Sequence, residues 1–345
     1  MNVLVVNNTA PFVRGGAEEL ADHLVRNLEL AGHRAQLVRI PFAWEPYDGI
    51  PGQMLMVKWL ELANVDHVIA LKFPAYLVEH PSKTLWVLHQ FRQAYELFDQ
   101  GASNIPDDDR GAAVRGAIRL ADDAALRDAR KVFVNSRVTR DRMVAYNGVE
   151  PEVLLPPVND PERFAGGEFG DYVFVGGRVN AMKRQELAVR ALRDADPRVR
   201  LVIAGPPDSE ADRVGLMRLV ESEGVGDRVR LDLRYLPREV YADYVTHARA
   251  VAYLPYDEDS LGYVSMEAAL AGRPLITLSD SGGIVDLVSD GVTGWVAEPT
   301  PAALADALSA PYRAGCDLAA TGRAARDRLE SLGLSWAHVV ERLLS

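Results

Sequence analysis

The sequence lacks the features that mark disulfide-bonded, exported and membrane-spanning proteins. Its 345 residues include one cysteine, Cys316, which excludes an internal disulfide and a cysteine metal site. No apolar run approaches the roughly 18 residues that a membrane-spanning helix needs. The first residues, MNVLVVNNTAPF, have neither a basic lead nor an extended apolar stretch, so a signal peptide is not expected. These absences together predict a cytoplasmic protein.

The chain also lacks an overall positive charge. Its formal net charge of −11 argues against non-specific binding of nucleic acid. One basic stretch, residues 110–142, holds nine Arg or Lys residues against four Asp residues. A solvated helix face is the simplest interpretation. The alternative is peripheral contact with anionic lipid at the inner membrane face, or with an anionic acceptor.

The proportions of hydrophobic residues (48%) and charged residues (25%) are typical of a soluble globular protein, and the length suits two domains. Apolar strand patterns alternate with helical patterns throughout. In the first half, strands are expected at 2–7, 35–40, 67–71, 84–88 and 131–135, with a helix at 17–31.

A proline- and glycine-rich segment at 155–170 is typical of a linker, and the alternation restarts after it. Strands are then expected at 172–175, 200–204, 251–254 and 274–277, with helices between them. We therefore predict an α/β protein with two Rossmann-like, doubly wound domains. Ligands of such sheets bind beyond the carboxyl ends of the strands, so the expected site is the cleft between the domains.

Two glycine-containing loops are the first candidates for this site. Gly15 and Gly16 end the loop after the first strand, where free N–H groups and the helix dipole suit an anion. A turn that merely needs glycine explains the pair equally well. This is not a G-x-G-x-x-G motif, and no acid lies suitably on the next strand for a dinucleotide ribose.

In the second half, 176-GGRVNAMKRQE-186 places Arg178 and Lys183 between a strand and the following helix. Both cations could reach a diphosphate, Arg178 as a planar fork and Lys183 as a point charge. Solvated cations are the alternative, although cations at a helix N-terminus oppose the macrodipole. His89, at the end of a first-half strand, is either a ligand contact or a hydrogen-bonded structural histidine.

The stretch 256-YDEDSLGYVSMEAALAGRP-274 puts a lone acid, Glu267, inside an apolar helix that starts after Gly262. Glutamate is rarely buried without a partner, so Glu267 either pairs with a buried cation or binds a ligand. A carboxylate can accept two ribose hydroxyls. Asp259, in the preceding loop, would lie nearer the other end of a bound molecule, or belongs to a solvated acidic loop.

These residues fit a single ligand in which a ribose, a diphosphate and a sugar lie in a row. Glu267 would hold the ribose, Arg178 and Lys183 the phosphates, and His89 with Asp259 the sugar. No convincing acidic cluster indicates a metal ion.

With these residues, the chain resembles the retaining glycosyltransferases of family four, which have the two-domain GT-B fold. The family's hallmark is two acids eight positions apart, here Asp259 and Glu267, with Gly262 between them. The resemblance continues through 280-DSGGIVDLVSDGVTGWVAEP-299, 176-GGRVNAMK-183, 135-NSRVTRDRM-143, 14-RGGAE-18 and the closing LSW of 334–336.

The resemblance implies a domain plan and a set of site residues. Residues 1–160 would form the acceptor domain and 161–332 the nucleotide-sugar donor domain, while 333–345 would cross back as a helix toward the first. The donor would contact the residues named above and the start of the second-domain helix: Gly15, Gly16, His89, Arg178, Lys183, Asp259, Gly262, Tyr263, Val264 and Glu267.

The implied reaction is a hexosyltransferase-like transfer from a nucleotide-diphosphate sugar to an acceptor hydroxyl, with retention, front-face attack and no metal or other cofactor. Asp259 replaces the family's usual glutamate, Ser260 a glycine and Leu261 an aromatic residue, so the donor sugar is not specified. The acceptor would be a sugar, a lipid-linked molecule or a small molecule.

The sequence leaves three other hypotheses of function open. An epimerase or a phosphorylase could use the same two-domain fold. A nicotinamide-dependent oxidoreductase would need the dinucleotide motif that is absent. A two-lobed protein that binds sugars without catalysis is the third.

Overall fold

The computed structural model describes all 345 residues, and the chain divides into two compact units. Unit 1 comprises Met1–Pro157 and Ser335–Ser345, and unit 2 comprises Val158–Leu334. The boundaries expected after residues 160 and 332 lie within three residues of these divisions. Each unit has its own sheet and its own hydrophobic core.

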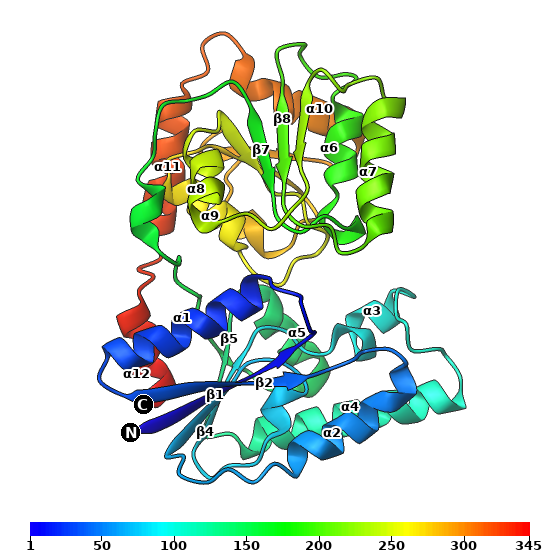
Figure 1. Cartoon of the computed structure of the whole chain (residues 1–345), viewed down its shortest axis with the longest axis vertical. Helices are drawn as coiled ribbons and strands as arrows, with labels where there is room; N and C mark the ends of the chain where they lie inside the picture. Colours follow the sequence, from blue (N-terminus) through cyan, green and yellow to red (C-terminus); the bar gives the residue numbers. More distant parts are fainter. The chain divides into compact units, whose positions relative to one another are not determined.

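Unit 1 contains a six-stranded parallel sheet in the order β2-β1-β3-β4-β5-β6, with helices packed on it (Figure 1). Its strands are β1 (Asn2–Thr9), β2 (Arg34–Pro41), β3 (His67–Ala70), β4 (Lys83–Val87), β5 (Lys131–Val134) and β6 (Glu152–Val153). Its α-helices are α1 (Gly16–Leu30), α2 (Ile50–Lys58), α3 (Glu96–Asp99), α4 (Asp109–Asp128), α5 (Arg137–Asn147) and α12 (Trp336–Leu344).

Unit 2 contains a second six-stranded parallel sheet, in the order β12-β11-β10-β7-β8-β9. Its strands are β7 (Val173–Gly176), β8 (Leu201–Ala204), β9 (Val229–Asp232), β10 (Ala250–Ala252), β11 (Leu275–Leu278) and β12 (Gly294–Ala297). Its α-helices are α6 (Gln185–Ala191), α7 (Glu210–Ser222), α8 (Arg238–Thr246), α9 (Tyr263–Leu270), α10 (Pro301–Ser309) and α11 (Leu318–Glu330).

The predicted α/β class and the doubly wound domains are confirmed. Central strands such as β3, β7 and β8 are buried along their whole length, because helices cover both faces of a parallel sheet. Their continuous apolar runs are what made them visible in the sequence. None of the helices combines the length and the apolar character that crossing a membrane requires.

The last helix, α12, belongs to unit 1 although it follows unit 2 in the chain. It packs against α1, on the side of the unit where both chain ends lie (Figure 1). Trp336 meets Trp86 of β4 edge-to-face at 6.3 Å between ring centroids. The Leu343 side chain is fully buried, and its carbonyl lies 3.2 Å from Nε2 of His67.

Strand order sets where each unit can bind a ligand. In unit 2, the chain runs from β7 outward through β8 to β9, and then returns to β10 on the other side of β7. In unit 1, the corresponding change of direction lies between β1 and β3. Loops leave the carboxyl ends of the two central strands in opposite directions at such a point, which opens a crevice for a ligand.

Candidate active site

In unit 2, Lys183 lies at the change of strand direction between β7 and β10. Asn180 begins the loop's single 3-10 turn by accepting a hydrogen bond from the Lys183 N–H at 3.0 Å. This cap turns the lysine side chain toward the loop that follows β10. There the ammonium group donates to the Tyr253 hydroxyl at 2.9 Å and forms an ion pair with Glu258.

These partners keep Lys183 charged. Burial alone would lower the pKa of an ammonium group, but Tyr253 and Glu258 outweigh it, and the pKa of Lys183 is raised. Lys183 is also the only lysine of residues 158–334, where every other strong cation is an arginine. A compact, charged ammonium group is thus held at the carboxyl edge of the sheet.

Arg178, five residues earlier, is half-exposed and takes part in a different contact. One of its terminal nitrogens donates to both carboxylate oxygens of Asp208, each at 3.1 Å. Asp208 follows β8 and also accepts from Asn180 at 2.8 Å. The guanidinium therefore lies on the same sheet edge as Lys183, one strand further along.

Arg184 is a residue that the sequence did not reveal as important. Its backbone is left-handed (φ 52°), which is uncommon for a residue with a side chain. Its Nε donates to the Leu254 carbonyl at 2.8 Å, and its terminal nitrogens bind both oxygens of Asp280 at 2.8–2.9 Å. Arg184 thereby ties the loops after β7, β10 and β11 together, although only its position beside Lys183 could have drawn attention to it.

The loop that carries Asp259 is fixed against the loop after β11. Backbone hydrogen bonds join Glu258 to Ser281 and Gly283 at 3.2 and 2.9 Å. A side chain at Gly282 would begin 2.3 Å from the Glu258 backbone, so this contact requires glycine. Asp259 itself is 7% exposed, which rules out the solvated acidic loop as its setting.

Helix α9 starts where the sequence predicted. Gly262 precedes it with φ 76°, and a Cβ there would lie 2.3 Å from the Tyr253 ring. Only glycine allows the ring to pack so closely, and the same ring carries the hydroxyl that contacts Lys183. Tyr263 and Val264 form the first turn, whose N–H groups have no partner within the helix.

Glu267, one turn further, is 2% exposed. Its Oε1 accepts from Nη2 of Arg238 at 2.6 Å, and the Tyr241 hydroxyl also hydrogen-bonds it. The pairing with a cation that the sequence left open is therefore present, through a residue of α8 that the sequence did not single out. This pairing does not exclude a ligand, since a carboxylate has lone pairs for about four hydrogen bonds.

In unit 1, Gly15 and Gly16 form the start of α1 as expected. Gly15 is extended, and its N–H donates to the Glu18 carboxylate at 2.8 Å. This hydrogen bond links the residue before α1 to the first turn of the helix. Glu18 is buried and lies 3.7 Å from the Lys72 ammonium group, which follows β3. The turn therefore lies at the change of strand direction of unit 1.

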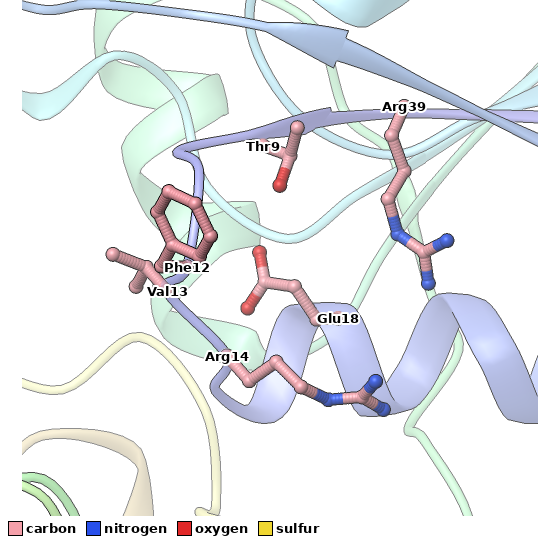
Figure 2. A pocket seen from close by; sticks show the side chains of 6 residues that line it. All are labelled: Thr9, Phe12, Val13, Arg14, Glu18 and Arg39. Atoms are coloured by element: carbon pink, nitrogen blue, oxygen red, sulfur yellow. The ribbon is translucent and has the colours of Figure 1, made fainter.

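A shallow pocket of about 300 Å³ opens beside this turn. It is lined by Thr9, Phe12, Val13, Arg14, Glu18 and Arg39. Figure 2 shows the Thr9 hydroxyl and the Glu18 carboxylate pointing toward one another, between the two apolar residues and the two arginines. Phe12 is fully exposed and left-handed (φ 65°), so it presents its ring to any molecule that enters.

His89, just past β4, is half-buried and its Nδ1 lies 2.7 Å from the Gln90 carbonyl. A carbonyl oxygen only accepts hydrogen bonds, so Nδ1 is the donor in this contact. The structure thus brings Lys183, Asp259, Gly262 and Glu267 to one edge of unit 2. The glycine turn and His89 belong to unit 1. No group of three or more His, Cys, Asp or Glu side chains is placed to hold a metal ion.

Comparison with known proteins adds three findings at the level of sequence. Residues 161–327 match the family model described as glycosyl transferases group 1. The D-inositol 3-phosphate glycosyltransferase of Mycolicibacterium smegmatis is 29% identical over 68% of this chain. The protein of the same name from Actinosynnema mirum is 31% identical over 66% of it. The chain spans 59% of the length of each relative.

Solved structures resemble the chain over nearly its whole length. Sucrose-phosphate synthase from Thermosynechococcus elongatus has a TM-score of 0.77 at 18% identity, covering 98% of this chain and 96% of that one. Anabaena HepE, in complex with UDP and glucose, has a TM-score of 0.73 at 16% identity, covering 98% and 97%. WaaG, a glycosyltransferase involved in lipopolysaccharide biosynthesis, has a TM-score of 0.71 at 14% identity, covering 99% of both chains. At these identities the likeness shows the fold.

Proposed function

The chain belongs to the glycosyl transferases group 1, and we propose that it transfers a sugar from a nucleotide-diphosphate sugar to an acceptor hydroxyl. We further propose that the anomeric configuration is retained, that attack occurs on the face from which the leaving group departs, and that no metal ion takes part. The family-four membership and the GT-B fold that the sequence indicated are confirmed by the group 1 match and the structural neighbours.

One observation carries the proposal: a charged lysine is held at the change of strand direction of unit 2. Lys183 is fixed there by Tyr253 and Glu258, at the position where doubly wound sheets bind the phosphates of nucleotides. Arg178 lies on the same edge. A diphosphate placed there would meet one point charge and one planar guanidinium.

These cations would act on the leaving group. Breaking the bond between the anomeric carbon and the donor oxygen leaves negative charge on the diphosphate. Lys183 and Arg178, with the backbone N–H groups at the start of α9, would stabilise that charge as it develops. Because all of these groups are positioned before the donor arrives, little reorganisation is required at the moment of reaction.

The rest of the donor would be distributed over the other predicted residues. Glu267 would accept the ribose hydroxyls, while Asp259 and His89 would contact the donor sugar. The glycine turn at Gly15 and Gly16 would approach the phosphates or the acceptor. Asp259 is one methylene shorter than the glutamate usual in the family, so we propose that it helps to select the sugar.

The names of the similar proteins guide the choice of substrates. HepE was solved with UDP and with UDP-glucose, which makes UDP-sugars the first donors to try. The relatives are named for D-inositol 3-phosphate, which makes phosphorylated polyols the first acceptors to try. We also propose a cytoplasmic location, with the exposed Arg127 and Arg137 of the basic stretch available to an anionic membrane surface.

The proposal is tested by incubating the protein with UDP-glucose, GDP-mannose and UDP-N-acetylglucosamine against a panel of polyol phosphates, with magnesium or EDTA. Proton NMR of the product gives the configuration at the anomeric carbon. We expect one donor to be consumed equally in magnesium and in EDTA, with its α configuration kept. A β-linked product would contradict retention, and activity lost in EDTA would contradict metal independence.

A further inference from the structure

Glu267 is a carboxylate that the fold has buried in advance of any ligand. Its side chain is 2% exposed, and isolated carboxylates at such depth are strongly disfavoured in the charged form. The carboxylate is compensated here because Arg238 donates from Nη2 at 2.6 Å and the Tyr241 hydroxyl adds a second hydrogen bond. Both partners come from the first turn of α8, which packs beside α9.

Arg238 is itself held firmly. The same Nη2 donates to the Asn159 carbonyl at 3.0 Å, so both of its hydrogens have defined acceptors. The guanidinium carbon lies 4.8 Å from the centre of the Phe164 ring and 5.5 Å from that of Tyr241. A planar group fixed by two acceptors and two rings has little conformational freedom. The carboxylate of Glu267, which is hydrogen-bonded to this group, is therefore restricted in its orientation as well.

We infer that Arg238 is a positioning residue for nucleotide recognition, which acts through Glu267. This inference rests on the proposed function. The ribose is read by Glu267, and Arg238 sets the orientation and the charge with which Glu267 meets the ribose hydroxyls. Carboxylates held by a second set of hydrogen bonds in this way bind without first having to be ordered.

The inference makes a prediction that simple stabilisation of the fold does not make. If Arg238 acts only on packing, its loss weakens binding of every nucleotide alike. If it acts through Glu267, its loss weakens only the part of the affinity that comes from the ribose hydroxyls. A nucleotide that lacks a hydroxyl is therefore the informative probe.

Titration calorimetry with UDP and 2′-deoxy-UDP measures this, or with the matching pair for whichever base the protein prefers. The variants are Arg238→Gln and Arg238→Lys, and the control is Arg190→Gln, which removes an exposed arginine of α6 that pairs with Glu223 at 3.1 Å. Thermal unfolding and circular dichroism confirm that each variant is folded before it is titrated.

We expect the wild type and Arg190→Gln to prefer UDP over 2′-deoxy-UDP by about tenfold, as for one hydrogen bond to a charged group. Arg238→Gln should bind UDP about tenfold more weakly, and it should weaken binding of 2′-deoxy-UDP, which keeps only the 3′-hydroxyl, by a smaller factor, so that the preference falls toward one. Arg238→Lys, which keeps the charge but not the planar fork, should lie between them.

Two results would overturn the inference. The first is that the Arg238→Gln variant loses affinity equally for both nucleotides, or loses no affinity for either. The second is a wild type that binds UDP and 2′-deoxy-UDP alike, since Glu267 would then not read the 2′-hydroxyl. A wild type that binds none of the nucleoside diphosphates is a different outcome, because it refutes the proposed function itself. If Arg238→Gln does not fold, Arg238→Lys and Tyr241→Phe decide the question with the same ratio.

Discussion

At the scale of single residues, the proposed chemistry separates the roles of Lys183 and Glu267. Lys183 would meet the charge that appears on the diphosphate only as the bond breaks, so Lys183→Ala should lower kcat by roughly 10²–10³-fold with little change in the KM for the donor. Glu267 would hold the ribose in both the ground and transition states. Glu267→Ala should therefore raise the donor KM more than it lowers kcat.

Steady-state kinetics of the two variants checks this contrast, with Arg190→Ala as the matched control in the same unit. Loss of Glu267 also leaves the Arg238 guanidinium without this carboxylate, so both variants need a thermal unfolding curve first. Small and equal effects of the two substitutions on kcat and on KM would speak against both roles.

A second residue-scale prediction concerns Asp122, which lies in the core of unit 1. Burial raises the pKa of Asp122 to about 7, although the hydroxyls of Tyr95 and Tyr76, which donate to it at 2.7 and 2.9 Å, oppose the shift. The folded protein thus keeps the proton to a higher pH than the unfolded chain does. Stability that is present near pH 4 must be lost as the pH rises toward 7.

Asp122→Asn removes the titrating group, so the difference in unfolding free energy between wild type and variant isolates its effect. Between pH 4 and pH 7 we expect the unfolding free energy of the wild type to fall by a few kcal/mol relative to that of Asp122→Asn, since each pKa unit corresponds to about 1.4 kcal/mol. Urea unfolding at several pH values measures it. A difference that stays constant over this range would be the contrary result.

Residue patterns identified Lys183 and Glu267 as candidates, but not the side chains that hold them. Three residues hold them from distant parts of the chain: Tyr253 and Glu258 contact Lys183 across 70 and 75 residues, and Arg238 contacts Glu267 across 29. Their distances along the chain carry no period that would connect them. Arg184 illustrates the same limit, because a structural arginine and the lysine that we propose to bind phosphate are neighbours in the sequence.

At the scale of elements, the start of α9 depends on the missing side chain of Gly262. With φ 76° and the Tyr253 ring 2.3 Å from where a Cβ would lie, Gly262→Ala must displace the ring. Because the Tyr253 hydroxyl contacts Lys183, we expect the variant to lose both stability and affinity for the nucleotide.

Gly215→Ala is the matched control for this element. Gly215 lies inside α7 with open space around its Cα, so alanine there should stabilise the helix by about 0.5–1 kcal/mol. Melting temperatures and nucleotide titrations of the two variants give the comparison. A Gly262→Ala variant that binds as tightly as the wild type would show that the close contact of ring and glycine is not needed.

The elements that the sequence did not predict share a physical feature. Strand β9 (VRLD) is an edge strand with no fully buried residue, and β12 (GWVA) is the opposite edge, only half of it buried. Neither shows the continuous apolar run that marked the central strands. Helix α2 was hidden for a related reason, because it exposes apolar residues such as Leu55 and Met56 and so lacks a clear amphipathic pattern.

At the scale of the whole molecule, unit 1 is completed by residues from the far end of the chain. Leu343 of α12 is fully buried there, so Leu343→Ala should cost unit 1 about 2–5 kcal/mol. Leu120→Ala, at a leucine of α4 that is 70% exposed, should change stability by less than about 0.5 kcal/mol.

Native-state hydrogen exchange locates the effect of Leu343→Ala. Amides of β4 and β5 should exchange faster in the variant, while those of β7 and β8 keep the wild-type rates, because each unit has its own core. Faster exchange confined to β7 and β8 would contradict the assignment of α12 to unit 1.

Unit 2 is proposed to hold a nucleoside diphosphate at the edge of its sheet, and thermal unfolding with UDP, GDP, ADP, dTDP and CDP is the decisive test of this binding. Each is measured with and without magnesium, with NAD as the control. One nucleoside diphosphate at about a hundred times its Kd should stabilise the protein by roughly 2.7 kcal/mol, equally with and without magnesium, and the effect should weaken in Glu267→Ala. No shift with any of the five would contradict the account and leave Glu267 as the structural partner of Arg238.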